Sequence, residues 1–229
     1  MEFVADEVAF LASLVPLEGA RIAELGCGKA DFARALIARA GAAKIEAFEV
    51  DRIQHSKNLT GAQDERLTFH HGGAEDIALE DGSVDGVVMM KSLHHVPMEY
   101  LDDALAEIRR VLKPGGWLYV SEPAYAGEFN EIVKLFHDEG EVRAAAQAAL
   151  RRAAQAKVLE PAMEKEFMAP LAFRDFADFE AKVIGATHTE HSLEPEQLAE
   201  VRRRFEPYVK PDGAKFTRPM RVTLMRRAP

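Results

Sequence analysis

The chain has 229 residues, which suits one α/β domain with a substantial hydrophobic core. Its 29 basic and 38 acidic side chains give a net charge of −9, which disfavours a nucleic-acid binder, because contacts to phosphates need a basic surface. Cys27 is the only cysteine, so a disulfide within the chain is excluded. No apolar run approaches the ~20 residues of a membrane span. We therefore expect a cytoplasmic protein without a membrane or nucleic-acid partner.

Short apolar stretches alternate with helical patterns in the first half of the chain. Strands are expected at Arg21–Leu25, Ile45–Glu49, Leu67–His70, Gly86–Met90 and Trp117–Ser121. Helices are expected at Phe3–Val15, Asp31–Arg39, Arg52–Leu59 and Glu99–Val111. This alternation predicts a doubly wound parallel sheet with helices on both faces. The carboxyl ends of the strands then share one edge, where ligands bind.

The second half is less regular. We expect helices at Phe129–Phe136 and Glu141–Leu159, and we interpret residues 124–172 as a helical lid inserted after the fifth strand. The last patterns predict a helix at Phe173–Ile184, a strand at Ala186–Leu193, a helix at Pro195–Phe205 and a strand at Arg218–Met225. We expect one domain over residues 1–229, with an N-terminal helix inside residues 1–15.

The most informative stretch is Glu24-Leu25-Gly26-Cys27-Gly28, in which the expected strand Arg21–Leu25 runs into a glycine turn. Its two glycines have no Cβ, so a ligand can approach the backbone, and the next helix presents free N–H groups and a positive dipole end. A dinucleotide fingerprint needs glycine or alanine where Asp31 stands, which argues against NAD or FAD.

The E-L-G-C-G stretch instead resembles motif I of the class I S-adenosylmethionine-dependent methyltransferases, in particular the small-molecule, methyltransferase-11-like type. The resemblance implies a seven-stranded, mostly parallel sheet with an antiparallel last strand. It also implies S-adenosyl-L-methionine as the cofactor, with its methionine part held by Glu24 and the loop backbone.

A second acidic stretch, Glu49-Val50-Asp51, ends the second long strand. In nucleoside-binding α/β folds an acid at this place bonds the ribose hydroxyls. We favour Glu49 for the ribose, because it lies at the strand end and E-V-D is similar to methyltransferases in which the first acid has this role. Asp51 would then cap the next helix. Two exposed acids at a helix start are the alternative.

The stretch from His71 to Leu79 resembles the adenine-side loop of the family, usually written G-D-A-x-x-L-P-F. Gly73 occupies the place of the usual aspartate, so the carboxylate contact to the adenine amino group is missing at this position. Ala74 and Glu75 can still offer backbone groups, and the side chain of Glu75 or Asp76 can replace the lost one.

The stretch from Asp81 to Met90, continued by Lys91-Ser92-Leu93-His94-His95, resembles motif IV of the family and its L-H-H-V continuation. The resemblance places these residues near the methionine end of the cofactor and the reacting centre. A histidine can act as a general base near neutral pH, or it can pack locally. We expect no metal, because no third ligand has a suitable spacing. The candidates for the reacting centre are His95, His94 and Lys91.

The run from Glu107 to Leu118 matches the R-x-L-K-P-G-G-x-L signature of the family, whose role is architectural. Glu122 follows the fifth strand and either faces the substrate or caps a helix. The resemblance covers about the first half of the chain, and the residues it assigns to the cofactor are Glu24, Gly26, Cys27, Gly28, Glu49, Val50, Asp51, Ala74, Glu75 and Lys91.

These observations predict a methyltransferase that acts, as a monomer or homodimer, on a small molecule. An apolar lid and an acidic surface favour a partly apolar metabolite as the methyl acceptor. The alternatives are another group transfer on the same fold, such as aminopropyl transfer, and a cofactor-binding module without turnover.

Overall fold

The structure is a computed structural model that describes residues 1–185 and 193–229. Its contacts divide the chain into two compact units. The sheet unit comprises Asp6–Glu122, Val142–Lys165 and Arg221–Pro229, and the aromatic unit comprises Met1–Ala5, Pro123–Glu141 and Glu166–Met220. The expected strand at Ala186–Leu193 falls mainly on residues 186–192, outside the described part of the chain.

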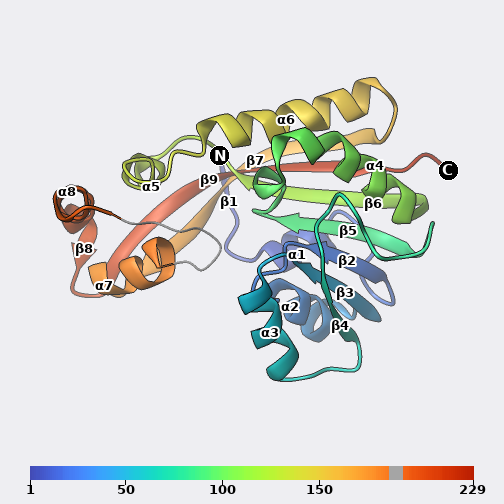
Figure 1. Ribbon diagram of the computed structural model, residues 1–229, viewed down its shortest axis with the longest axis horizontal. Coiled ribbons are helices and arrows are strands. Elements are labelled where there is room, and N and C mark those ends of the chain that lie inside the picture. The colour runs from blue at the N-terminus through green and yellow to red at the C-terminus, as the bar shows by residue number, and fades with distance from the viewer. Residues whose placement is uncertain (186–192) are drawn as a thin grey trace. The chain divides into compact units, whose positions relative to one another are not determined.

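Five parallel strands form the centre of the sheet unit (Figure 1). They are β2 (Arg21–Leu25), β3 (Lys44–Glu49), β4 (Leu67–His71), β5 (Val84–Met90) and β6 (Leu112–Pro123). Their order is β6-β5-β2-β3-β4, so the direction of winding reverses between β2 and β5. Ligands of doubly wound sheets bind at this switch point, beyond the carboxyl ends of the strands.

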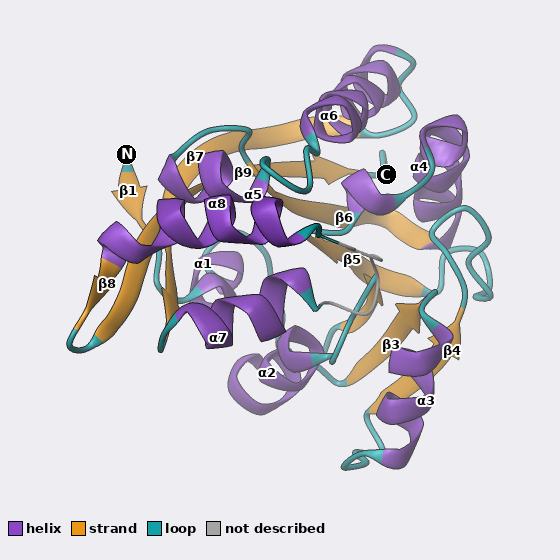
Figure 2. Ribbon diagram, turned by 60° about the vertical axis from the view of Figure 1, so that its left-hand side comes forward, coloured by secondary structure: helices purple, strands orange, loops and turns teal. Residues whose placement is uncertain are grey.

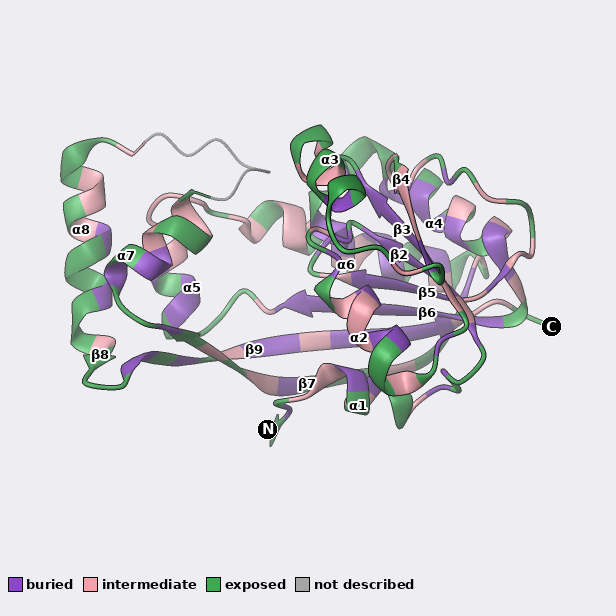
Figure 3. Ribbon diagram, turned by 90° about the horizontal axis from the view of Figure 1, so that it is seen from below, coloured by how far each residue is buried: buried purple, intermediate pink, exposed green. Residues whose placement is uncertain are grey.

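Both faces of this sheet carry helices. The crossovers from β2 to β4 contain α2 (Asp31–Ala40) and α3 (Arg52–Thr60), whereas the crossover from β5 to β6 contains α4 (Leu101–Val111) and runs in the opposite direction. Because such crossovers are right-handed, α4 covers the face opposite to α2 and α3. Helix α6 (Gly140–Gln155) joins α4 in one hydrophobic core with the central strands. The central strands are accordingly buried (Figure 3).

The last strand, β9 (Gly213–Arg226), lies next to β6. Gly115 near the start of β6 donates to the Arg227 carbonyl, and Arg227 donates back to Gly116. Ala124, after the end of β6, donates to Pro219, which precedes Arg227. The paired residues in and after β9 have lower numbers as the residue numbers along β6 rise, so the two strands run in opposite directions. The expected antiparallel last strand is therefore confirmed.

The described sheet has nine strands where we expected seven. Two of them, β1 (Glu2–Phe3) and β8 (Val209–Lys210), are two residues long. Seven remain without them, and the sixth in chain order is β7 (Glu160–Phe173). The mixed, doubly wound fold class is therefore confirmed.

The N-terminal segment differs from its prediction. The helical pattern of Phe3–Val15 yields only α1 (Glu7–Ala12), because Asp6 accepts a hydrogen bond from the Ala9 N–H and begins the helix there. The two residues of β1 pair instead with Phe167 and Met168 of β7. Hydrogen bonding to another strand has thus overridden the local helical pattern.

The segment from 124 to 172 contains α5 (Glu128–Val133) and α6 but continues into β7 (Figure 2). Its role as a lid stays a prediction, as does the single domain over 1–229. The helix expected at Phe173–Ile184 consists of α7 (Phe176–Phe179) and the π-helix η3 (Glu180–Ile184), and α8 (Pro195–Phe205) lies where it was expected.

The aromatic unit has a core of its own. Its centre is a cluster of phenylalanine rings whose neighbouring centroids lie 4.9 to 6.4 Å apart. The buried members of the cluster are Phe129, Phe173, Phe176, Phe179, Phe205 and Phe216. Phe129, which we had assigned to an apolar lid, thus serves as a core residue of this unit. Each buried ring of this size contributes more to folding than an aliphatic side chain does.

Candidate active site

The glycine loop between β2 and α2 has a fixed backbone. Gly26, Gly28 and Ala30 have φ values of 72°, 53° and 59°, in the left-handed region. The N–H groups of Gly26 and Cys27 both donate to the Phe48 carbonyl of β3, at 3.0 and 2.9 Å. A Cβ on Gly28 would meet no atom of the described residues within 4 Å, its chain neighbours apart. The loop is therefore anchored on one side and open at Gly28.

Glu49 holds this loop from the neighbouring strand. One oxygen of its carboxylate, Oε2, accepts from the Gly28 N–H at 2.7 Å, and Oε1 accepts from the Asp51 N–H at 2.9 Å. The side chain is only 7% exposed. Each carboxylate oxygen has a second lone pair, so the group can also accept from a ligand hydroxyl.

Asp51 caps α3, as we expected if Glu49 were the inner acid. Its Oδ1 accepts from the N–H groups of Ile53 and Gln54 at 2.8 and 3.3 Å. Between the two acids Val50 is 60% exposed, and Ile53 is 59% exposed. Two large apolar side chains near Asp51 in the chain are thus exposed, and a flat apolar ligand group could cover them.

Glu24 is the second buried acid of the site. It is 2% exposed, and its Oε2 finds no hydrogen-bond partner among the described residues. Burial raises the pKa of Glu24 to about 8, although the Ala33 N–H of α2 and the charge of Lys91 oppose this shift. A buried carboxyl oxygen without a partner is costly unless a ligand supplies a donor.

Cys27 is buried in the same loop. Burial raises the pKa of the Cys27 thiol far above its ordinary value, and the nearby Glu24 and Glu49 add to this effect. Asn58 of α3 contacts the same region: its Nδ2 donates to the Gly28 carbonyl at 2.8 Å. Asn58 was not predicted from the sequence, because the local pattern does not show which polar residue of a helix is buried. In the structure it is 4% exposed and is the buried residue of α3, and it supports the glycine loop directly.

The loop after β4 shows what stands in the place of the missing aspartate. A Cβ built on Gly73 would lie 2.2 Å from Oε2 and 2.4 Å from Oε1 of Glu75. The Glu75 carboxyl group therefore occupies the space of a side chain at position 73. Ala74 between them is buried, whereas Asp76 is exposed. Of the two acids that the sequence offered as replacements, Glu75 fills this space.

The residues after β5 meet the glycine loop. Ser92 Oγ donates to the Leu25 carbonyl at 2.6 Å, and a Cβ on Gly26 would lie 2.6 Å from the Ser92 Cβ. Lys91 has a φ of 59°, and its N–H donates to the Ser121 carbonyl at 2.7 Å. The sequence placed Ser92 near the reacting centre but gave no signal for its contact with the glycine loop, because this contact joins two different crossovers.

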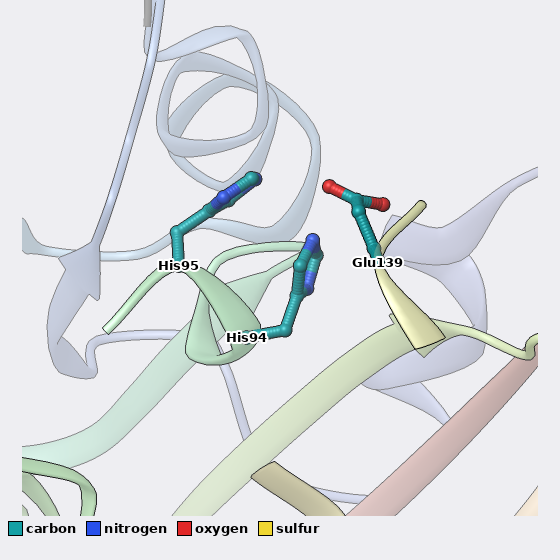
Figure 4. A group of neighbouring side chains, drawn as sticks. All are labelled: His94, His95 and Glu139. Carbon is teal, nitrogen blue, oxygen red and sulfur yellow. The ribbon is translucent and has the colours of Figure 1, made fainter. Parts of the chain in front are cut away.

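His94 and His95 lie side by side on the short helix η1 (Leu93–His95), with ring centroids 4.1 Å apart (Figure 4). His94 is 4% exposed, and its Nδ1 is in hydrogen-bond contact with Oε2 of Glu122. The other oxygen of Glu122 accepts from the Leu93 N–H at 2.9 Å. Glu122 is 3% exposed, and it accepts from the N–H of the first residue of η1, as a capping side chain does.

Comparisons with known proteins agree with this arrangement. Residues 23–120 match the family model of the methyltransferase domain. The resemblance to the class I S-adenosylmethionine-dependent methyltransferases is therefore confirmed. The matched segment contains the glycine loop, Glu49, Glu75 and the two histidines.

Individual relatives extend the picture. The chain is 33% identical over 121 residues to the demethylmenaquinone methyltransferase of Bacillus velezensis, which covers 48% of this chain and 49% of that protein. It is 38% identical over 118 residues to the ubiquinone biosynthesis O-methyltransferase of Xanthomonas campestris, with coverages of 49% and 46%. The chain thus spans about half the length of the curated relatives it matches.

A solved structure is similar over almost the whole chain. An S-adenosylmethionine-dependent methyltransferase from Mesorhizobium loti superposes with a TM-score of 0.57 at 17% identity, covering 96% of both chains. At this identity the likeness shows the fold. No helix among the described residues is long and apolar enough to cross a membrane.

Proposed function

We propose that the chain is an S-adenosylmethionine-dependent methyltransferase that transfers a methyl group to a small, partly apolar metabolite. The observation that carries this proposal is the unpartnered Oε2 of Glu24, buried beside an open glycine loop at the switch point of the sheet. The cofactor offers a donor that suits this oxygen, its ammonium group, together with ribose hydroxyls that suit Glu49.

The residues of the site fit the parts of this cofactor. Glu24 and the backbone of Gly26, Cys27 and Gly28 would hold its methionine part. Glu49 would accept from the ribose hydroxyls. Asp51, which caps α3, would support the Glu49 carboxylate through its backbone N–H. Bound S-adenosylmethionine supplies a methyl group activated by a sulfonium.

The adenine would lie against the exposed apolar side chain of Val50, beside Ala74 and Glu75. Glu75 would accept from the adenine amino group, because its carboxyl group fills the space over Gly73. This assignment gives the chain a carboxylate for the adenine although the usual aspartate is absent.

The reacting centre would lie near Lys91, His94 and His95, which follow the carboxyl end of β5. Ser92 connects this segment to the glycine loop. The protein would contribute mainly by positioning the acceptor and excluding water, and a lid formed by residues 124–172 would assist.

The names of the two curated relatives point to quinone biosynthesis, which supports a small, partly apolar acceptor. The net charge of −9 supports the absence of a nucleic-acid partner. We also place the protein in the cytoplasm, as a monomer or homodimer.

Titration calorimetry tests the proposal. Wild-type protein should bind S-adenosylmethionine and S-adenosylhomocysteine with micromolar dissociation constants, and Glu49→Ala should weaken both by about 10- to 100-fold, since it removes a charged acceptor. Asp81→Asn, which changes an exposed acid paired with Arg110, is the matched control and should leave both constants unchanged. If neither ligand binds to the wild type, the proposal fails. Binding without methyl transfer to any small-molecule acceptor would favour a module without turnover.

A further inference from the structure

We infer that Glu107 and Arg110 of α4 clamp the loop after β4 and thereby position Glu75 for the amino group of the adenine. This inference rests on the proposed function. It gives a role in cofactor recognition to the start of the run from Glu107 to Leu118, for which the family resemblance implied only an architectural role. Neither residue of the clamp would touch the cofactor, so both are positioning residues.

The loop needs support from outside itself. Residues 72–83 connect the parallel strands β4 and β5 without a helix, whereas the other crossovers between the central strands contain α2, α3 or α4. A helix pairs most of its backbone N–H and C=O groups internally. An irregular segment has to pair these groups with other parts of the protein or with water. In this loop the side chains of α4 supply partners.

The guanidinium group of Arg110 is held in one orientation. Its Nε and Nη2 donate to the two carboxylate oxygens of Glu107, each at 2.7 Å, and such a bidentate pair fixes the plane of the group. The same plane then serves the loop: Nη2 donates to the Ile77 carbonyl at 2.7 Å and Nη1 to the Leu79 carbonyl at 2.8 Å. Nη1 also contacts the exposed side chain of Asp81, where water competes and an asparagine could still accept. The clamp therefore acts on the loop backbone.

Glu107 adds a contact in the opposite sense. Its Oε2 accepts from the Ile77 N–H at 3.1 Å, so both backbone groups of Ile77 are paired with α4. The Ile77 side chain is 1% exposed and belongs to the hydrophobic core that α4 shares with the central strands. The hydrogen bonds from Arg110 hold the pKa of Glu107 below its ordinary value, so the carboxylate stays charged at neutral pH. Ile77 is thus a fixed point of the loop.

Glu75 lies between this fixed point and a second one. At the start of the loop the Gly72 N–H donates to the Glu49 carbonyl at 3.2 Å, which ties the loop to β3. Residues 73–76 remain between the two anchors, and they include the Glu75 carboxyl group that fills the space over Gly73. Because Glu75 is two residues from Ile77, loss of the anchor at Ile77 would release this carboxyl group from its place.

The position of the Glu75 carboxylate determines a preference between bases. A carboxylate only accepts hydrogen bonds, so it attracts the amino group of adenine and opposes the oxygen that hypoxanthine has at the same ring position. Both effects require the carboxylate to be in place. A loop released from α4 would have to be ordered when the ligand binds, at a cost in conformational entropy. The clamp therefore supports both the affinity for adenine and the discrimination against hypoxanthine.

Calorimetry with two ligands measures this discrimination. Wild-type protein should bind S-adenosylhomocysteine about 10-fold or more tightly than S-inosylhomocysteine, and Arg110→Ala should bring the two dissociation constants to within about 3-fold of each other. Arg110→Lys should have nearly the same effect, because lysine keeps the charge but cannot serve Glu107 and both carbonyls in one plane. In a Glu75→Ala background, Arg110→Ala should not change the ratio of the two constants further.

Arg227 offers the matched control. Its Nη1 donates to the carbonyls of Arg109, Arg110 and Leu112 at the end of the same helix, so it supports α4 through the backbone and from outside the loop. Arg227→Ala should lower stability and leave the ratio of the dissociation constants as in the wild type. An equal fall of the ratio in Arg227→Ala and Arg110→Ala would show a general loosening of α4 and overturn the inference.

Hydrogen exchange tests the clamp without any ligand. In Arg110→Ala and in Glu107→Ala the amides of residues 73–79 should exchange about 10-fold faster or more, while those of β2 and β5 keep their wild-type rates. If Arg110→Ala does not fold, Glu107→Ala and Arg110→Lys give the same two readouts. Unchanged exchange of the loop, or an unchanged ratio in a folded variant, would overturn the inference alone. Wild-type protein that binds neither ligand would refute the proposed function, and the role in adenine recognition with it.

Discussion

Ser92 and Gly26 pack so closely that a single added methyl group at Gly26 would lie 2.6 Å from the Ser92 Cβ. The same serine donates a hydrogen bond to the carbonyl of Leu25, at 2.6 Å. Gly26 is thus required twice, once for its φ of 72° and once for the close approach of a residue that follows another strand. The contact joins the two crossovers that meet at the switch point.

Gly26→Ala should lower the free energy of unfolding by about 2–4 kcal/mol, since it combines backbone strain with overpacking. Gly28→Ala shares a positive φ of 53°, but apart from its chain neighbours the added methyl group meets no described residue within 4 Å, so it should cost only about 1 kcal/mol. Ser92→Gly in the Gly26→Ala background should recover the overpacking part. Urea unfolding of the wild type, Gly26→Ala, Ser92→Gly and the double variant gives the coupling energy, and strictly additive effects would show that the close approach carries no energy.

Glu24 should make the ligand-free protein less stable as the pH rises. Its folded pKa of about 8 lies above the ordinary value of 4.5, so the folded state binds more protons than the unfolded state between these values. Stability from this group is therefore lost as pH increases from about 4.5 to 8. Glu24→Gln should stabilise the protein at pH 9, by up to roughly 4 kcal/mol, and have little effect at pH 4.5. Thermal unfolding at both pH values measures this.

The same substitution should also abolish the stabilisation that S-adenosylmethionine confers at pH 8. A variant that is more stable alone and no longer stabilised by the ligand has lost a binding group rather than its fold. If Glu24→Gln destabilises the protein at pH 9, the prediction is wrong, because the buried carboxylate of Glu24 then does not lower the stability of the ligand-free protein.

Glu46, on the neighbouring strand, should behave in the opposite way. It is as buried as Glu24, and burial alone would raise its pKa, but hydrogen bonds from His70, Arg21 and Lys44 outweigh burial and lower it to about 2. Its contribution is present above about pH 4.5 and is lost as the pH falls toward 2. Glu46→Gln should cost about 1–3 kcal/mol at pH 7, less than for a fully buried pair, because Arg21 and Lys44 are partly exposed.

The comparison with Glu24→Gln makes this prediction selective. Urea unfolding of both variants at pH 7 and pH 9 should give effects of opposite sign, although each variant replaces one buried glutamate by its neutral amide. Glu46→Gln should leave the affinity for S-adenosylhomocysteine unchanged, and a loss of affinity would place Glu46 in the binding site.

Glu75 and Gly73 allow a swap experiment on the adenine side. Glu75→Ala should weaken the binding of S-adenosylhomocysteine about 10-fold, and Gly73→Asp with Glu75→Ala should restore it, because the carboxylate returns to the same space. Gly73→Asp alone brings two carboxylates together and should not improve binding. Calorimetry with S-inosylhomocysteine, which lacks the amino group, should show no loss in Glu75→Ala. An equal loss for both ligands would assign Glu75 a purely structural role.

Much of this site could be predicted from local sequence. The glycine loop, the strand-end acid Glu49 and the helix cap Asp51 each depend on residues that are close together in the chain, so a short motif determines them. The five central strands appear within a few residues of their expected positions for the same reason. At the N-terminus the prediction failed, because pairing with β7 decided the conformation of Glu2 and Phe3.

Contacts between segments that are distant in the chain could not be predicted from local sequence patterns. The sequence by itself determined the class of fold, the glycine loop and the candidate acids, since periodicity and turn chemistry act over a few residues. Only the tertiary structure decided that Glu75 fills the space over Gly73, that Ser92 requires Gly26, and that Glu122 contacts both His94 and the Leu93 N–H. These choices depend on burial and hydrogen bonding across different crossovers, which arise when the strands pair and bring their carboxyl ends to one edge.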